Sequence, residues 1–397
     1  MKGFFLSYPL KSHNIPVHSI IMDLADNGHK ITYYNTQRFA NFYNNKNITF
    51  RAYPNYSGYE EENVNGYLSL SKLGMLILES AESVLEFVEN EIEKEKPDFI
   101  IHLKFGLWAK LLSIKYNIPA VSLVTGFVLN NKYLLNEVDK PFNKSVELNS
   151  ILTTRHLYQK AQALYQKFNL TTIDNTELFV NEEKLNIVLC FKEFQPSAHL
   201  FGNEYKYIGL PLENSDKKKS CDIIYISLGT TFNDDKFFFD LCINALSDIG
   251  DDIVISVGNK LSKLMFGSVP NSIKIVAYAN QLEILKNCKL FITHGGANSV
   301  HEAIYYTTPM IVIPQTLEHE VFAKRSAEFG LGIYLKRETL TTDILKNTIS
   351  YILRDKQLFI DNLFKFKKRT FISNSTNIAV NTILDFLNKE CNKKVSL

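Results

Sequence analysis

The hydrophobic residues of this chain recur in two rhythms that alternate along its length. Short, continuous apolar runs are typical of buried strands, and stretches in which apolar residues return every three or four positions are typical of helices. The runs lie at residues 2–7, 30–34, 48–52, 99–103, 120–124 and 185–190, and again at 223–228, 253–257, 273–276, 290–293 and 311–314. Strands that alternate with helices predict parallel sheets. We therefore expect an α/β chain of two Rossmann-like, doubly wound domains that face each other across a cleft.

The predicted boundary between the two halves lies where the composition changes. Residues 203–221 carry Gly, Pro and a run of lysines, which is typical of an exposed linker. The expected organisation is a first domain at 1–205, a linker at 206–221, a second domain at 222–375 and a final helix at 376–397 that packs back toward the first domain. Helical patterns rich in aromatics over 126–180 predict an insertion that lines the cleft.

Length, charge and cysteines narrow the class of protein. A chain of 397 residues can bury two or three full cores. A net charge of +2 favours neither nucleic acid nor a membrane as partner, and no apolar run is as long as a membrane span. The N-terminus becomes polar too early for a signal peptide. The five cysteines are scattered without a CxxC pair, so we expect no zinc site, no disulfide framework and a reducing cytoplasm.

Two glycine-containing turns carry the first candidate chemistry. Residues 227–231 (SLGTT) follow the first strand of the second half, and His294-Gly295-Gly296 follows the fourth. A strand that ends in such a turn and opens a helix presents free backbone N–H groups to an anion. Neither turn matches the P-loop or the dinucleotide fingerprint. Two such turns in one domain, one with a histidine, predict a nucleoside diphosphate site.

Several polar residues near these turns have an ordinary structural explanation as well. Ser299 and Glu302 have the spacing of a capping box, and Glu318 opens another helix, where an acidic residue is common. His301 is expected on a partly exposed helix face. His13, in the loop expected after the first strand, has the right intrinsic pKa for a general base, although a lone histidine is more often structural.

The motifs together resemble the bacterial macrolide-type members of glycosyltransferase family 1, which use a UDP-sugar and have the GT-B fold. The likeness covers nearly the whole chain. It rests on Ser12-His13-x-x-Pro16, on 191–196 (FKEFQP), on 227–230 (SLGT), and above all on 278–335, which is similar to the donor signature of the family.

The resemblance implies a role for each matching residue. Tyr278 would stack on the uracil, Gln281 would contact the nucleoside, and Glu302 would bind the ribose hydroxyls. Glu318 and His319 would bind the donor sugar, and His13 would be the catalytic base. The diphosphate would be held by Thr230, His294, Gly296, Asn298 and Ser299.

The implied reaction is an inverting O-glycosylation without metal or cofactor. UDP-glucose would be the donor, and the acceptor a hydrophobic small molecule such as a phenol, flavonoid or macrolide-like natural product. Acceptor contacts are expected from 55–90 and 125–165. No nucleic-acid partner or membrane insertion is expected, and the chain would be a monomer or a homodimer.

Three positions depart from the family pattern. Leu103 stands where an Asp usually orients the catalytic histidine, and Lys104 beside it would depress the pKa of His13. His319 replaces the usual Gln, so the donor sugar stays open, and Asn280 replaces a Pro. Two alternatives to the transferase therefore stand: a UDP-sugar-binding protein with impaired catalysis, and an epimerase of UDP-GlcNAc with the same fold.

Overall fold

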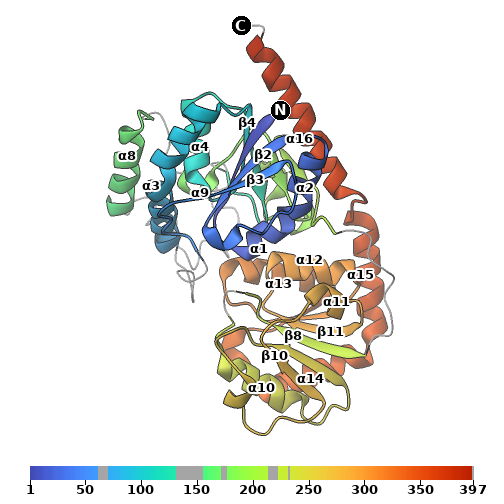
Figure 1. Cartoon of the computed structure of the whole chain (residues 1–397). Helices are drawn as coiled ribbons and strands as arrows, with labels where there is room; N and C mark the ends of the chain where they lie inside the picture. The colour runs from blue at the N-terminus through green and yellow to red at the C-terminus, as the bar shows by residue number, and fades with distance from the viewer. Residues whose placement is uncertain (61–69, 131–154, 171–176, 213–221, 231–232, 396–397) are drawn as a thin grey trace. The chain divides into compact units, whose positions relative to one another are not determined.

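The computed structural model describes residues 1–60, 70–130, 155–170, 177–212, 222–230 and 233–395. The chain divides into two compact units, one formed by Met1–Pro211 with Asn374–Leu397 and the other by Leu212–Ser373. Each unit contains one parallel sheet with helices on both faces, as Figure 1 shows. The predicted α/β class and the two parallel sheets are confirmed.

The sheet of the first unit has seven strands in the order β3-β2-β1-β4-β5-β6-β7. Because helices cover both faces, a strand can be apolar throughout, and β4 and β5 are buried at every position. The strands are β1 Lys2–Leu6, β2 Lys30–Asn35, β3 Ile48–Ala52, β4 Phe99–Leu103, β5 Ala120–Val124, β6 Asn186–Val188 and β7 Tyr205–Tyr207.

Two groups of helices cover this sheet. On one face α3 packs against α4, α8 and α9, and on the other α16 packs against α2 (Figure 1). The hydroxyls of Ser19 and Thr376 lie 3.1 Å apart between α2 and α16. The C-terminal helix is therefore part of the first unit. The helices are α1 Lys11–Asn14, α2 His18–Asp26, α3 Leu70–Glu95, α4 Leu107–Lys115, α8 Arg155–Lys167, α9 Glu177–Val180 and α16 Ser375–Val395.

The sheet of the second unit has six strands in the order β10-β9-β8-β11-β12-β13. They are β8 Ile223–Ser227, β9 Asp252–Ser256, β10 Ile273–Val276, β11 Cys288–Thr293, β12 Met310–Val312 and β13 Gly332–Tyr334. Its helices are α10 Lys236–Leu246, α11 Gln281–Leu285, α12 Ala297–Tyr305, α13 Leu317–Glu328, α14 Thr342–Arg354 and α15 Lys356–Thr370.

Both sheets reverse their strand order at one point. The chain winds outward from β1 to β3 in one direction and from β4 to β7 in the other, and the second unit repeats this at β8 and β11. Open α/β sheets bind ligands at this switch point, beyond the carboxyl ends of the strands. The strand order therefore predicts ligand-binding turns after β1 and β4 in the first unit and after β8 and β11 in the second.

Some predicted boundaries were wrong. Tyr205–Tyr207 was partly assigned to the linker but forms edge strand β7, and β13 was not predicted. The loop expected around His13 contains helical turn α1, and residues Gln37–Phe39 form a 3₁₀ turn. The rest of the expected linker, 213–221, and much of the expected insertion, 131–154 and 171–176, lie outside the described residues.

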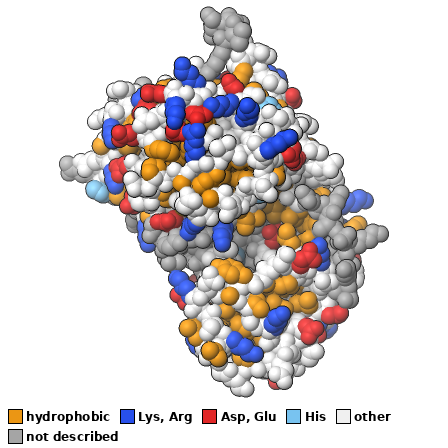
Figure 2. Space-filling model, in the orientation of Figure 1, with side chains coloured by type: hydrophobic (Ala, Val, Ile, Leu, Met, Phe, Trp, Pro, Cys, Tyr) orange, Lys and Arg blue, Asp and Glu red, His pale blue; other side chains and the backbone are white. Residues whose placement is uncertain are grey.

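The molecular surface carries charges of both signs. On the face drawn in Figure 2, acidic and basic side chains are interspersed among hydrophobic ones, as a net charge of +2 over 397 residues leads one to expect. Across the part of the chain with defined placement, no helix combines the length and the apolar character that crossing a bilayer requires.

Candidate active site

In the second unit, His294 lies directly after β11 with a glycine on each side of its ring. A Cβ added at Gly229 would lie 2.6 Å from Cε1 of His294, and one added at Gly296 would lie 2.5 Å from Nε2. Gly229 also has a φ of +76°, which disfavours any residue with a side chain. Glycine at both positions is therefore what allows the imidazole to lie between the two turns.

The start of α12 and the loop after β8 complete this site. Gly296 is the N-cap of α12 and makes no side-chain cap hydrogen bond, and the helix begins with Ala297, Asn298 and Ser299. The backbone N–H groups of a first helical turn point toward the helix N-terminus, where they can bind an anion. The amide of Asn233, in the loop after β8, donates to the carbonyl oxygens of Gly229 and Thr230 at 3.0 and 3.3 Å. The two predicted turns thus lie at neighbouring strand ends, an arrangement suited to a phosphate.

Glu302 lies one turn further along α12 and does not cap it. The helix begins at Ala297, so the capping box expected from Ser299 and Glu302 is not formed. Instead, the side-chain amide of Gln281 donates to Oε2 of Glu302 at 2.5 Å and to the Ser299 hydroxyl at 3.2 Å. Burial raises the pKa of Glu302 to about 7, although the Gln281 hydrogen bond lowers it. The Glu302 carboxyl group is therefore positioned by Gln281 and can accept hydrogen bonds from hydroxyl groups.

Three further predicted residues lie just before α11 or in the first turn of α13. Tyr278 precedes α11, and its side chain is 56% exposed, as a stacking platform for a base requires. The rings of His294 and His319 meet edge to face, with centroids 4.5 Å apart. Thr316 is the N-cap of α13 and accepts from the His319 N–H at 3.2 Å. The exposed Glu318 is therefore not the cap of this helix.

The histidines of the second unit are neutral at pH 7. Burial lowers the pKa of His294 to about 4 and that of His319 well below its usual value. A neutral imidazole can donate one hydrogen bond to a phosphate oxygen but carries no charge to it. His301, expected to be partly exposed, is instead fully buried against Phe322 because it lies on the inner face of α12.

In the first unit, a buried polar network holds α1, which carries His13. The Asn14 side chain donates to the carbonyl oxygens of Tyr8 and Leu10, each at 2.8 Å. Its Oδ1 accepts from the hydroxyls of Ser7 at 2.6 Å and Tyr33 at 3.2 Å. Asn14 is fully buried, so these bonds fix the helical turn at the carboxyl end of β1.

His13 Nδ1 contacts two hydroxyl groups. Thr125 Oγ1 lies at 2.7 Å and the Tyr8 phenol at 3.1 Å. The rings of Tyr8, Tyr59 and Phe105 have centroids 5.5, 6.5 and 6.5 Å from the imidazole. Burial, reinforced by the charge of Lys104, lowers the pKa of His13 to about 4. The imidazole is therefore neutral at pH 7 and lies among aromatic rings.

Sequence reasoning missed Thr125 and Tyr8 as partners of His13. Thr125 directly follows β5 and Tyr8 lies two residues after β1, so both are at the carboxyl edge of the sheet, where ligands bind. Their position at this edge of the sheet is the sequence signal that could have identified them as partners of His13. Leu103, where the family has Asp, is fully buried at the end of β4. Within the described ranges, no carboxylate makes a hydrogen bond or ion pair with His13.

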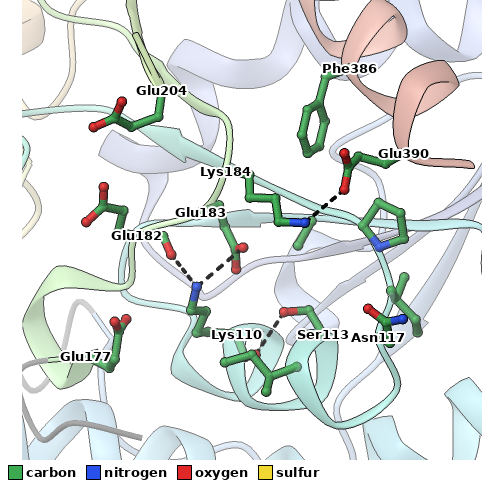
Figure 3. Close-up of a pocket in the computed structure, with 14 residues that line it drawn as sticks. Lys110, Ser113, Asn117, Glu177, Glu182, Glu183, Lys184, Glu204, Phe386 and Glu390 are labelled. Atoms are coloured by element: carbon green, nitrogen blue, oxygen red, sulfur yellow. Dashed lines mark hydrogen bonds and ion pairs between the residues drawn. The ribbon is translucent and has the colours of Figure 1, made fainter. Parts of the chain in front are cut away.

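A cavity of about 580 Å³ in the first unit is not lined by His13 (Figure 3). It opens beside the amino ends of β5 to β7, whereas substrates of such sheets bind at the carboxyl ends. Its charged groups pair with one another: Lys110 lies 3.4 Å from Glu183 and Lys184 lies 2.9 Å from Glu390. We do not assign it to the reaction.

Comparison with known proteins bears on the family and the fold of the chain. Residues 240–365 match the family model "Erythromycin biosynthesis protein CIII-like, C-terminal domain". The chain is 27% identical over 365 residues to the uncharacterized UDP-glucosyltransferase YojK of Bacillus subtilis, covering 88% of this chain and 89% of YojK. It is 28% identical over 368 residues to the NDP-glycosyltransferase YjiC of the same organism, covering 90% and 91% of the two chains. These findings support a macrolide-type glycosyltransferase of family 1.

A solved structure defines the fold of this glycosyltransferase. The glycosyltransferase of kitacinnamycin superposes with a TM-score of 0.84 at 20% identity, covering 97% of this chain and 99% of the other. The GT-B fold and the glycosyltransferase family predicted from the sequence are confirmed. Unit 1 carries His13, and unit 2 carries the turns around His294.

Proposed function

We propose that this glycosyltransferase transfers a sugar, with glucose as the first candidate, from a UDP-sugar to a hydroxyl group of a hydrophobic small molecule. The observation that carries the proposal is the set of groups around His294 and Glu302. Two glycine turns and the start of α12 suit a diphosphate, and Glu302 suits vicinal hydroxyls such as those of ribose. The similarity to UDP-glucosyltransferase YojK and to YjiC supports a nucleotide sugar as donor.

In the proposed donor complex each residue has one task. Tyr278 stacks on the uracil, Gln281 and Glu302 bind the nucleoside, and Glu318 and His319 bind the sugar. The diphosphate is bound by Thr230, His294, Gly296, Asn298 and Ser299. The negative charge that develops on the departing UDP is stabilised by His294 and the backbone donors of α12, so the proposal needs no metal ion.

The proposed reaction is a direct displacement. His13 accepts the proton of the acceptor hydroxyl as its oxygen forms a bond to C1 of the sugar. The bond between C1 and the UDP oxygen breaks at the same time, and its electron pair leaves with UDP. Attack from the face opposite UDP inverts the configuration at C1. The four described cysteines are free thiols, which suits the cytoplasm as the proposed compartment.

A second candidate function is UDP-sugar binding without efficient transfer. The observation that favours it is the contact of His13 with hydroxyl groups where the family has a carboxylate. Incubation with UDP-glucose and a panel of phenols, flavonoids and macrolides, with and without EDTA, separates the two. We expect a glycoside of inverted anomeric configuration and release of UDP, unaffected by EDTA. UDP binding with no product from any acceptor would overturn the transferase.

A further inference from the structure

The contact between His13 and Thr125 determines which ring nitrogen of His13 can act as the base. A neutral imidazole serves as a base only through the nitrogen that carries no proton. If Nε2 is to accept the proton of the acceptor, Nδ1 must carry the ring proton and donate it. The Thr125 hydroxyl at 2.7 Å is the nearest acceptor for that proton, from the strand end two places along the sheet from β1.

A hydroxyl replaces only part of what a carboxylate does. It can accept the Nδ1 hydrogen bond, which selects the tautomer and orients the ring, but it brings no negative charge to stabilise the protonated imidazole. The described groups around His13 add no negative charge either. Of the described groups that face it, Tyr8 and Tyr59 are neutral phenols, Phe105 is apolar, and Lys104 is a cation that disfavours a second positive charge.

We propose that Thr125 is the positioning residue of His13, and that this uncharged pairing restricts the enzyme to acceptors with an acidic, aromatic hydroxyl. This inference rests on the proposed function. Proton transfer becomes easier as the acceptor becomes a stronger acid. A phenol such as that of Tyr has a pKa of about 10, whereas aliphatic alcohols are far weaker acids, comparable to water.

The surroundings of His13 favour the same class of molecule. Tyr8, Tyr59 and Phe105 place aromatic rings within 6.5 Å of the imidazole. Ring edges and faces at this spacing pack well against another flat ring. Geometry and acidity therefore select phenols by two independent effects.

The test compares phenol with cyclohexanol, an aliphatic alcohol of similar size, in wild type and in Thr125→Val, Thr125→Ser and Thr125→Asp. We expect wild type to prefer phenol in kcat/KM by at least about 100-fold. Thr125→Val should lower kcat for phenol about tenfold or more with KM for UDP-glucose within about twofold, and Thr125→Ser should restore it. Thr125→Asp should move the acidic limb of the pH–rate profile upward and reduce the preference for phenol.

A second readout does not depend on turnover. Nitrogen-15 NMR of His13 should show the proton on Nδ1 in wild type and a shift toward the other tautomer in Thr125→Val. Ser122→Ala removes a buried hydroxyl from the same strand and is the matched control, with tautomer and selectivity unchanged. A wild-type proton on Nε2, or a Thr125→Val enzyme with unaltered kcat and selectivity, would overturn the proposal. If wild type converts neither acceptor, the proposed function fails, whereas the tautomer still tests Thr125.

Discussion

The pH dependence of UDP binding should be set by Glu302. Burial raises its pKa to about 7 in the free protein. The ionised fraction then falls from about nine-tenths at pH 8 to about one-tenth at pH 6. Ribose hydroxyls donate most strongly to the ionised carboxylate. If that form binds UDP, the dissociation constant should rise about tenfold between pH 8 and pH 6, which is ~1.4 kcal/mol.

The variant Glu302→Gln tests this reasoning. It keeps the shape of the side chain but removes the charge and the titration. A hydrogen bond to a charged group contributes about 1.5–3 kcal/mol, so UDP should bind roughly 10- to 100-fold more weakly at pH 8. Any pH dependence of the dissociation constant that remains in this variant comes from the titration of UDP itself and of other groups. The ratio of the wild-type to the variant dissociation constant therefore isolates Glu302.

Isothermal titration calorimetry is the assay, performed at pH 6, 7 and 8 in two buffers of different ionisation enthalpy. At pH 7 wild type should release about half a proton more on binding UDP than Glu302→Gln does. Glu328→Gln is the control, because it removes the same charge from an exposed position of the same unit. With dTDP, which lacks the 2′-hydroxyl, the loss caused by Glu302→Gln should be smaller. Identical pH dependence in wild type and Glu302→Gln would refute the reasoning.

Two further perturbations test other parts of the second unit. Gly229→Ala places a Cβ 2.6 Å from the His294 ring at a φ of +76°, so UDP affinity measured by calorimetry should fall about tenfold or more. Gly267→Ala adds a Cβ in open space and should leave UDP affinity unchanged. Equal UDP affinities of the two variants would contradict the assignment of this turn to the diphosphate. Burial lowers the pKa of His301 to about 3. Below the unfolded value of about 6.5 the unfolded chain therefore binds a proton on His301 that the folded chain does not, and the free energy of unfolding falls as the pH falls. Between pH 7 and pH 5 this loss is about 2 kcal/mol, and urea unfolding of His301→Gln should show a pH dependence smaller by that amount; an unchanged dependence would contradict the burial argument.

The fold was predictable because its strongest signals are local. Strands such as β4 and β5 are continuous apolar runs, and their predicted bounds agree with the structure. Edge strands β7 and β13 were missed because each has three residues and gains its stability from one neighbouring strand, which no local pattern shows. The C-terminal helix was expected to pack toward the first domain, but no local pattern identifies its partner α2, which lies more than 300 residues away in the chain.

The candidate site was predictable to a different degree in each unit. The residues from Tyr278 to His319 form one continuous signature, so their locations after β10, β11 and β12 follow from the sequence once the strands are known. The pairing of His13 with Thr125 does not, because these residues are separated by 112 positions. The capping box predicted at Ser299 is also not formed, since Gly296 rather than Ser299 is the N-cap of the helix. Both outcomes are set by tertiary contacts.

The most direct test of the central claim is the rate of glucoside formation from UDP-glucose and phenol by wild type and by His13→Ala, with UDP affinity measured on both proteins. General-base catalysis contributes about 10²- to 10⁴-fold. We therefore predict that His13→Ala loses at least about 100-fold in rate while it binds UDP as tightly as wild type. An unchanged rate in His13→Ala, or a wild-type enzyme that binds UDP yet forms no glucoside from any acceptor, would contradict it.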